Sequence, residues 1–240
     1  MSHEEAKLPP SPEPRAAALW TGGKDSCLAL QRCRRDGYRI DRLVTFAPEK
    51  PNFLAHPLEV MKLQSAALGL PHQVITVGEP YGQSYRQAII TLQQSGISAL
   101  ITGDIDLVAG LPNWVRQCAE GLELEIVMPL WNRPREELMR EIVAEGFHVI
   151  FSCVKRPWFT ADWLGRAIDS TAIEQLKAIA PQHSLDICGE NGEYHTLVLD
   201  GPGFARAISL KYRQAAQGDM MHLIITDAEL SPRCEHNNDE

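Results

Sequence analysis

The stretch Thr21-Gly22-Gly23-Lys24-Asp25-Ser26 brings together the residue types of an anion-binding loop. Its two glycines let the backbone approach a ligand closely. The N–H groups at a helix start favour negative charge, and two hydroxyls and the Lys24 ammonium add donors. A phosphate or pyrophosphate suits these groups. A plain Gly-Gly turn, capped by Asp25 or Ser26, is the alternative that needs no ligand.

This stretch is not a Walker A loop, because Asp25 separates Lys24 from Ser26, and it is not Gly-x-Gly-x-x-Gly either. It resembles the pyrophosphate loop of the N-type ATP pyrophosphatases, with Thr21 where serine is more usual. The resemblance implies that residues 21–26 hold the phosphates of ATP, which is split to AMP and pyrophosphate, with Lys24 and Asp25 in catalytic roles. Mg²⁺ is expected with it, because the ion neutralises the leaving pyrophosphate.

Later segments resemble one branch of that superfamily, the diphthine–ammonia ligase family. They are Gly103-Asp104-Ile105, the segments 128–131 and 163–166, and the block from Cys188 to Val198. The resemblance runs from about residue 17 to residue 204. It implies an ATP-dependent ligase that activates a carboxylate as an acyl-adenylate and joins it to ammonia as an amide.

Gly103 and Asp104 follow a predicted strand, as residues 21–26 do. Ligands of a doubly wound sheet bind at the carboxyl ends of its strands, so we expect the two segments to meet there. Asp104 would then orient the nucleotide or hold Mg²⁺, and Asp25 is the other candidate for the ion. A helix cap or turn residue is the alternative interpretation of Asp104.

The block 188–198 is predicted to bind the acyl substrate through Glu190, Asn191, Glu193, His195 and Thr196. Glu193 and His195 would share a face of an extended segment. Two carboxylates and an imidazole can bind polar groups, or take the proton that ammonia must lose on attack. A polar hairpin with an Asn191-Gly192 turn is the other interpretation, and such a turn leaves room for a site at its base.

Two positions of this block differ from diphthine-specific members, which carry Glu-Gly-Gly-Glu, an aromatic residue and then Glu. Asn191 replaces the first of those glycines, and His195 takes the final acidic position. Diphthine carries a trimethylammonium group, which favours a carboxylate or an aromatic face. The form seen here resembles a bacterial branch with another carboxylic acid as substrate, for which cobalamin metabolism is one suggestion. Protein diphthine and a small-molecule carboxylate therefore both stand as acyl partners.

Apolar spacing predicts alternating strands and helices up to residue 130. The expected strands are 16–20, 42–47, 73–77, 99–102 and 125–128, and the expected helices are 26–36, 58–68, 82–95 and 114–121. This alternation predicts an α/β fold with a doubly wound parallel sheet, Rossmann-like and of the HUP (adenine nucleotide alpha hydrolase-like) type that the family resemblance implies.

The pattern changes beyond residue 130. Helices are expected at 135–146 and 171–180, an apolar run covers 148–154, and strands are expected at 196–199, 205–212 and 221–226. They predict a smaller C-terminal α+β domain, with an extension of the first sheet as the alternative. We divide the chain into a disordered leader (1–14), an ATP-binding domain (15–130), a substrate-recognition domain (131–230) and a disordered tail (231–240).

Composition narrows the function classes. The 240 residues carry a formal charge of −8, which argues against bulk nucleic-acid binding. No apolar run reaches the length of a membrane helix, and no signal segment begins the chain. Six cysteines without a Cys-x-x-Cys pair favour a reduced cytoplasmic protein; a homodimer is one candidate assembly. An RNA-modifying pyrophosphatase and a non-catalytic ATP-binding module remain as rival functions.

Two further sets of residues have both a binding and a packing interpretation. His56, before Pro57 at a predicted helix start, either lies near the nucleotide or caps the helix. Trp114, Trp131, Trp158 and Trp163 either stack on adenine or belong to the core, which is the commoner role of such residues.

Overall fold

A computed structural model of the chain describes residues 13–107 and 110–233, without the side chains of residues 182–183. The predicted leader and tail lie for the most part outside the described residues. The first half forms a parallel sheet with the strand order β3-β2-β1-β4-β5. Its strands are β1 (Arg15–Leu19), β2 (Arg39–Ala47), β3 (His72–Thr76), β4 (Ala99–Ile101) and β5 (Glu125–Val127). The strand order reverses between β1 and β4, which opens a binding crevice at their carboxyl ends.

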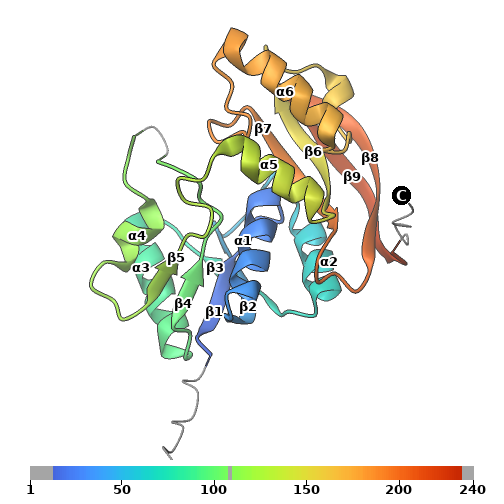
Figure 1. Cartoon of the computed structure of the whole chain (residues 1–240). Helices are drawn as coiled ribbons and strands as arrows, with labels where there is room; N and C mark the ends of the chain where they lie inside the picture. Colours follow the sequence, from blue (N-terminus) through green and yellow to red (C-terminus); the bar gives the residue numbers. More distant parts are fainter. Residues whose placement is uncertain (1–12, 108–109, 234–240) are drawn as a thin grey trace, which may run out of the picture.

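Helices cover both faces of this sheet, so the predicted doubly wound α/β fold is confirmed (Figure 1). The helices are α1 (Lys24–Arg35), α2 (Leu58–Leu68), α3 (Tyr81–Gln94) and α4 (Trp114–Ala119). Apolar residues of α1 and α2 share one core with the alternate side chains of β1, while Ile89 and Leu92 of α3 pack with Val44 and Leu100 on the other face. Apolar side chains at helical spacing thus fix which face each helix covers.

The second half forms its own antiparallel sheet, in the order β7-β6-β9-β8, so it does not extend the first sheet. The elements are α5 (Arg135–Ala144), β6 (His148–Lys155), a 3-10 turn (Ala161–Trp163), α6 (Ser170–His183), β7 (Tyr194–Asp200), β8 (Ala207–Gln217) and β9 (Met220–Ser231). No helix in the part of the chain that the structure describes is long and apolar enough to cross a bilayer.

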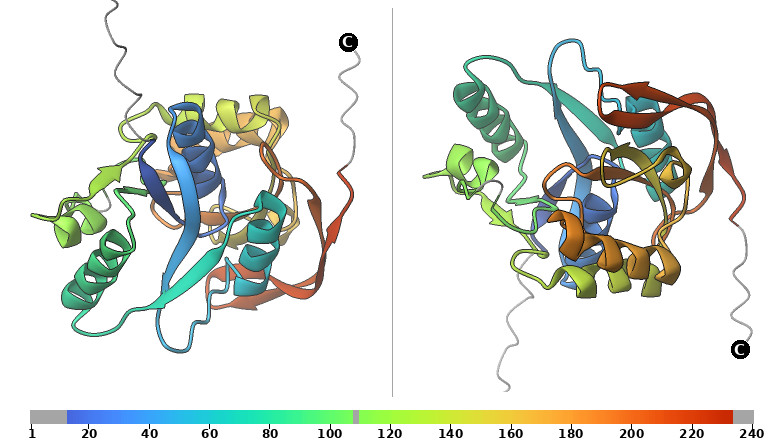
Figure 2. Two further views of the ribbon diagram at one scale, coloured as in Figure 1. Left: turned by 90° about the horizontal axis from the view of Figure 1, so that it is seen from below. Right: turned by 90° about the horizontal axis from the view of Figure 1, so that it is seen from above.

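The two halves share a core. Helices α1 and α2 lie between the two sheets, where α1 contacts β7 and α2 contacts β8 and β9 (Figures 1 and 2). Arg32 of α1 pairs with Glu141 of α5, and the Ala205 N–H donates to the Ala67 carbonyl over 2.7 Å. The single apolar cluster around α1 includes residues of β6 and β7. The chain therefore holds β7 directly against the start of α1.

Candidate functional site

The predicted anion loop joins β1 to α1 at the crevice. Gly22 has φ +73°, which favours glycine, and Gly23 begins α1 without a side-chain cap. Inside the loop, the Ser26 hydroxyl donates to the Gly23 carbonyl over 3.0 Å, and the Thr21 hydroxyl donates to Ser26 Oγ over 3.3 Å. A helix start without a side-chain cap, beside exposed Thr21, is suited to an anion.

The second predicted segment meets this loop. A Cβ added at Gly103 would lie 2.7 Å from the Asp25 carbonyl carbon and 2.8 Å from the Ser26 nitrogen, so only glycine fits here. Next to it, Asp104 Oδ2 accepts hydrogen bonds from Thr102 Oγ1 (2.6 Å) and Asn113 Nδ2 (2.7 Å). The expectation that residues 21–26 and 103–104 come together is confirmed.

Lys24 is buried between the two halves of the chain rather than open to solvent. Its Nζ donates to the Cys188 carbonyl (2.5 Å) and to Asp25 Oδ2 (2.7 Å), and its backbone N–H donates to Thr196 Oγ1 (3.1 Å). Burial alone would lower the pKa of the Lys24 ammonium. Asp25, with smaller contributions from Tyr194 and other neighbours, outweighs it and raises the pKa above its usual value. Lys24 stays charged, and one of its three Nζ donors remains for a ligand.

The block 188–198 is held together by hydrogen bonds to Glu193, and its chain turns over residues 189–192. Glu193 is buried and accepts from the backbone N–H groups of Asp186 (2.8 Å) and Asn191 (3.0 Å). The Gly192 N–H donates to the Gly189 carbonyl over 3.1 Å, so the turn is centred on Glu190 and Asn191 rather than on Asn191 and Gly192. The hairpin interpretation is wrong, because helix α6 and not a strand precedes this turn. Glu193 and Thr196, both predicted to touch substrate, are thus occupied by protein partners, whereas Asn191 is exposed.

Two of the predicted substrate residues in this block, Glu190 and His195, have shifted pKa values. Burial raises the pKa of Glu190 to about 7, Asp25 adds to the shift and Lys24 opposes it. Burial, and then Lys24, lowers the pKa of His195. Its ring meets that of His56 edge-on, with centroids 5.3 Å apart. His195 is therefore a neutral imidazole at neutral pH, and Glu190 can gain and lose a proton there.

His56 lies over the loop, as one of its two interpretations required. A Cβ at Gly23 would be 3.3 Å from His56 Cε1. Burial, with His195 and Lys24, lowers the pKa of His56 to about 3, and a hydrogen bond with the Thr21 backbone opposes the shift. The Nδ1 atom is buried without a hydrogen-bond partner among the described residues. His56 is a neutral member of the site.

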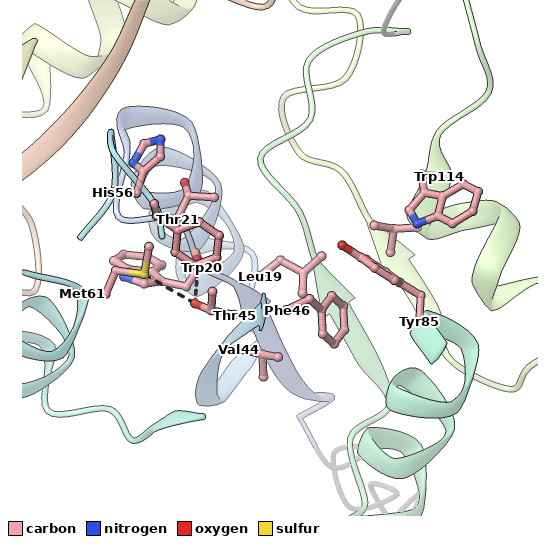
Figure 3. Close-up of a pocket in the computed structure, with 12 residues that line it drawn as sticks. Leu19, Trp20, Thr21, Val44, Thr45, Phe46, His56, Met61, Tyr85 and Trp114 are labelled. Atoms are coloured by element: carbon pink, nitrogen blue, oxygen red, sulfur yellow. Dashed lines mark hydrogen bonds between the residues drawn. The ribbon is translucent and has the colours of Figure 1, made fainter. Parts of the chain in front are cut away.

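A cavity of about 380 Å³ opens beside the loop (Figure 3). Most of its lining is apolar or aromatic, and it comprises Leu19, Trp20, Thr21, Val44, Thr45, Phe46, Phe53, His56, Met61, Tyr85, Trp114 and Val115. Phe46, Tyr85 and Trp114 form one wall, with successive ring centroids 5.0 and 6.0 Å apart, while Thr21 and His56 lie at the other side. The volume and lining suit a flat organic group next to an anion.

Sequence reasoning missed Phe46, Tyr85 and Gln64 as site residues. Phe46 had a signal, because it lies near the carboxyl end of the predicted strand 42–47, and ligands bind at that end of such strands. Gln64 had one too, because an amide four residues after Val60 interrupts the apolar stripe of α2. Tyr85 had none, since a tyrosine on an amphipathic helix has core roles more often. Trp114 lines both this cavity and a neighbouring one of about 390 Å³ that contains Asp104.

The described residues contain no group of three or more His, Cys, Asp or Glu side chains that could hold a metal. Asp25 Oδ1 is nevertheless buried without a hydrogen-bond partner among them. One such oxygen fits Mg²⁺, which binds proteins through one or two carboxylates and otherwise keeps water and phosphate oxygens. Asp104 is the weaker fit, since Thr102 and Asn113 already bind one of its oxygens.

Family comparisons agree with this geometry. The model described as Diphthamide synthase N-terminal domain matches residues 14–122, and that described as Diphthamide synthase C-terminal domain matches residues 134–226. The chain belongs to the diphthamide synthase family. Both candidate segments of this family member, the loop 21–26 and the block 188–198, lie within the matched ranges.

Several relatives of this family member carry the name diphthine–ammonia ligase. That of Mus musculus is 26% identical over 231 residues, which cover 84% of each chain. The Homo sapiens protein is 25% identical, and the match covers 81% of this chain and 82% of the human protein. The match to the Schizosaccharomyces pombe protein covers only 37% of that protein's length. Among solved structures, one described as a predicted subunit of tRNA methyltransferase from Methanocaldococcus jannaschii matches this chain. It matches with a TM-score of 0.45 and 17% sequence identity, and the match covers 78% of this chain and 98% of the solved chain.

Proposed function

We propose that this protein is an ATP-dependent ligase that joins ammonia to a carboxylate and releases AMP and pyrophosphate. One observation carries the proposal: Lys24 of the anion loop bonds both Cys188 and Thr196 of the block 188–198. Activation of a carboxylate requires the acyl group and the α-phosphate of ATP to meet, and this contact brings their two candidate sites together. The ligase names of relatives that match over most of both chains support the same reaction.

ATP would lie along the crevice with its base in the aromatic cavity and its phosphates on the loop. The cavity begins at Thr21, so the base and the phosphates fit one continuous ligand. The third Nζ donor of Lys24 would face the phosphates, together with N–H groups of the loop other than the backbone N–H of Lys24, which bonds Thr196. Asp25, with its unpartnered Oδ1, would hold Mg²⁺, which neutralises the pyrophosphate charge when bound.

The chemistry proceeds in two transfers. The substrate carboxylate oxygen attacks the α-phosphorus, the bond to the β-phosphate oxygen breaks, and pyrophosphate leaves. The nitrogen of ammonia then attacks the acyl carbon, the bond to AMP breaks, and the nitrogen gives up a proton. Glu190 is the proton acceptor, because its carboxyl titrates near neutrality beside Lys24 and Asp25.

Diphthine is the acyl substrate that the named relatives suggest, and a small carboxylic acid is the second candidate. The replacement of an acidic residue by His195 removes an attraction for a trimethylammonium ligand, and a charged imidazole would add repulsion. Burial lowers its pKa, so it is neutral and does not repel a cation. We therefore keep protein diphthine as the first candidate.

The rival RNA-modifying chemistry needs a reactive thiol, and the structure offers none among the described cysteines near the loop. Burial raises the pKa of Cys188 to about 12 and that of Cys153 to about 11, so both remain thiols at neutral pH. The five described cysteines are free, which fits a reducing compartment, and the cytoplasm is our proposed location.

The test is release of AMP from ATP, Mg²⁺ and ammonium in the presence of cell extract divided by size. We expect AMP and pyrophosphate in equal amounts, with a dependence on ammonium and on one fraction. Stimulation by the macromolecular fraction identifies a protein substrate, and stimulation by the small-molecule fraction identifies a metabolite acid. Formation of ADP, or AMP release that does not respond to ammonium, would contradict the proposal.

A further inference from the structure

Gln64 of α2 is completely buried, yet it makes three hydrogen bonds around the anion loop. Its Oε1 accepts from Trp20 Nε1 over 3.0 Å. Its Nε2 donates to the Gly22 carbonyl and to the Val198 carbonyl, each over 2.8 Å. An indole nitrogen can only donate a hydrogen bond, and a carbonyl can only accept one. All three partners therefore fix the same orientation of the Gln64 amide, with Oε1 toward Trp20 and Nε2 toward the two carbonyls.

These bonds fix the peptide group between Gly22 and Gly23. The Gly22 carbonyl also accepts from the Val198 N–H over 3.0 Å, so it is held on the side of α2 and β7. In a planar trans peptide the N–H points opposite to the carbonyl. The Gly23 N–H therefore faces away from Gln64, toward the exposed Thr21, and donates a long hydrogen bond of 3.4 Å to its Oγ1, which a bound phosphate oxygen would share or replace.

Gly22 and Gln64 are also matched in shape. A Cβ at residue 22 would lie 2.2 Å from Gln64 Oε1. The amide thus occupies the space that only a glycine leaves. Its two N–H donors bond one carbonyl of the loop and one of β7, so a single side chain from a third element ties both together.

We propose that Gln64 is a positioning residue, which aims the Gly23 N–H at the bound phosphates and couples the loop to β7. This inference rests on the proposed function in placing phosphates at the loop. Without the Nε2 donors, only the Val198 N–H still holds the Gly22 carbonyl, so the peptide is less restrained and its oxygen can turn toward the anion more easily. The expected consequence is weaker phosphate binding.

The probe is inorganic pyrophosphate with Mg²⁺, titrated by calorimetry into the full chain. Gln64→Met keeps the side-chain length and removes every hydrogen bond, and Gln64→Glu keeps the shape but replaces the donors. The matched control is Ser65→Ala on the same helix, because Ser65 Oγ donates to the Leu70 carbonyl (2.7 Å) and takes no part in the loop. Thermal melts of all three variants report the structural cost.

We expect both Gln64 variants to bind pyrophosphate at least about tenfold more weakly than the wild type. The reason is that the hydrogen bond from the Gly23 N–H to a charged phosphate oxygen is lost. Ser65→Ala should keep the wild-type affinity even where its melting temperature falls. The pyrophosphate affinity of Gln64→Glu is compared with that of Ser65→Ala at each pH. The ratio should recover as the pH falls, because a protonated carboxyl can again donate a hydrogen bond.

Unchanged pyrophosphate affinity in Gln64→Met, or an equal loss in Ser65→Ala, would overturn the role of Gln64. The ligase proposal fails separately, if the wild-type chain binds pyrophosphate but releases no AMP in response to ammonium. A wild-type chain that binds no pyrophosphate overturns both the loop assignment and the positioning role.

Discussion

Replacing Glu190 with glutamine should make the protein more stable above neutral pH while lowering its activity. Burial raises the pKa of this carboxyl from 4.5 to about 7, and the Asp25 carboxylate adds to the shift. A carboxyl with a raised pKa holds its proton more tightly in the folded chain than in the unfolded chain. Between pH 4.5 and pH 7 the folded state therefore binds more protons, and wild-type stability falls as the pH rises through that window.

The size of the effect follows from the shift. Each pKa unit corresponds to about 1.4 kcal/mol, so a charged Glu190 costs on the order of 3 kcal/mol above pH 7. Glutamine has nearly the same shape and carries no charge. Glu190→Gln should thus gain up to that amount above pH 7 and nothing below pH 4.5.

The assay is urea unfolding of the wild type and Glu190→Gln between pH 5 and pH 8.5. Glu137→Gln, which removes an exposed carboxyl of α5, is the control and should follow the wild-type pH dependence. A difference between wild type and Glu190→Gln that is the same at pH 5 and at pH 8 would refute the reasoning. Ammonium-dependent AMP release should fall in Glu190→Gln even where the variant is more stable, because its amide cannot accept a proton.

Three further substitutions test the site. Gly103→Ala places a Cβ 2.7 Å from the Asp25 carbonyl carbon, so melts should show a lower Tm and calorimetry a weaker affinity for ATP. Tyr85→Ala removes the middle ring of the aromatic wall, and calorimetry should show weaker ATP binding with pyrophosphate binding unchanged. Arg135→Met removes the partner of Asp186, which lies 3.0 Å away; urea unfolding should show a loss of about 1–3 kcal/mol, and turnover should fall more than ATP affinity.

The loop and its meeting with Gly103 could be predicted from the sequence, because both depend on a local rule. The segments follow strands of one parallel sheet, and the carboxyl ends of such strands share an edge. The helix 58–68 was predicted with the bounds that α2 has, since its apolar stripe begins after Pro57 and ends at Gly69. Short-range patterns are sufficient for such elements.

The partners of Lys24 could not be predicted, because they lie across the chain. Cys188 is 164 residues away and Thr196 is 172 residues away, and only the packing of the antiparallel sheet on α1 brings them near. The same packing gives Thr196 a structural partner where the sequence suggested a substrate contact. Strand β8 runs to Gln217 rather than to residue 212, because its exposed end pairs with β9 without an apolar pattern.

Lys24 connects the two halves of the proposed site through its bonds to Cys188 and Thr196. An ammonium that must bind a phosphate is normally left in solvent, yet here it is buried against the Cys188 carbonyl. Its burial is tolerable because Asp25 balances the charge at 2.7 Å. A nucleotide phosphate that approaches Lys24 would compete with the Asp25 carboxylate for the ammonium. A movement of the Lys24 ammonium would also disturb its hydrogen bond to the Cys188 carbonyl, at the start of the block 188–198. If the loop and the block 188–198 bind as proposed, occupation of the loop and the arrangement of that block are therefore coupled through the Lys24 side chain.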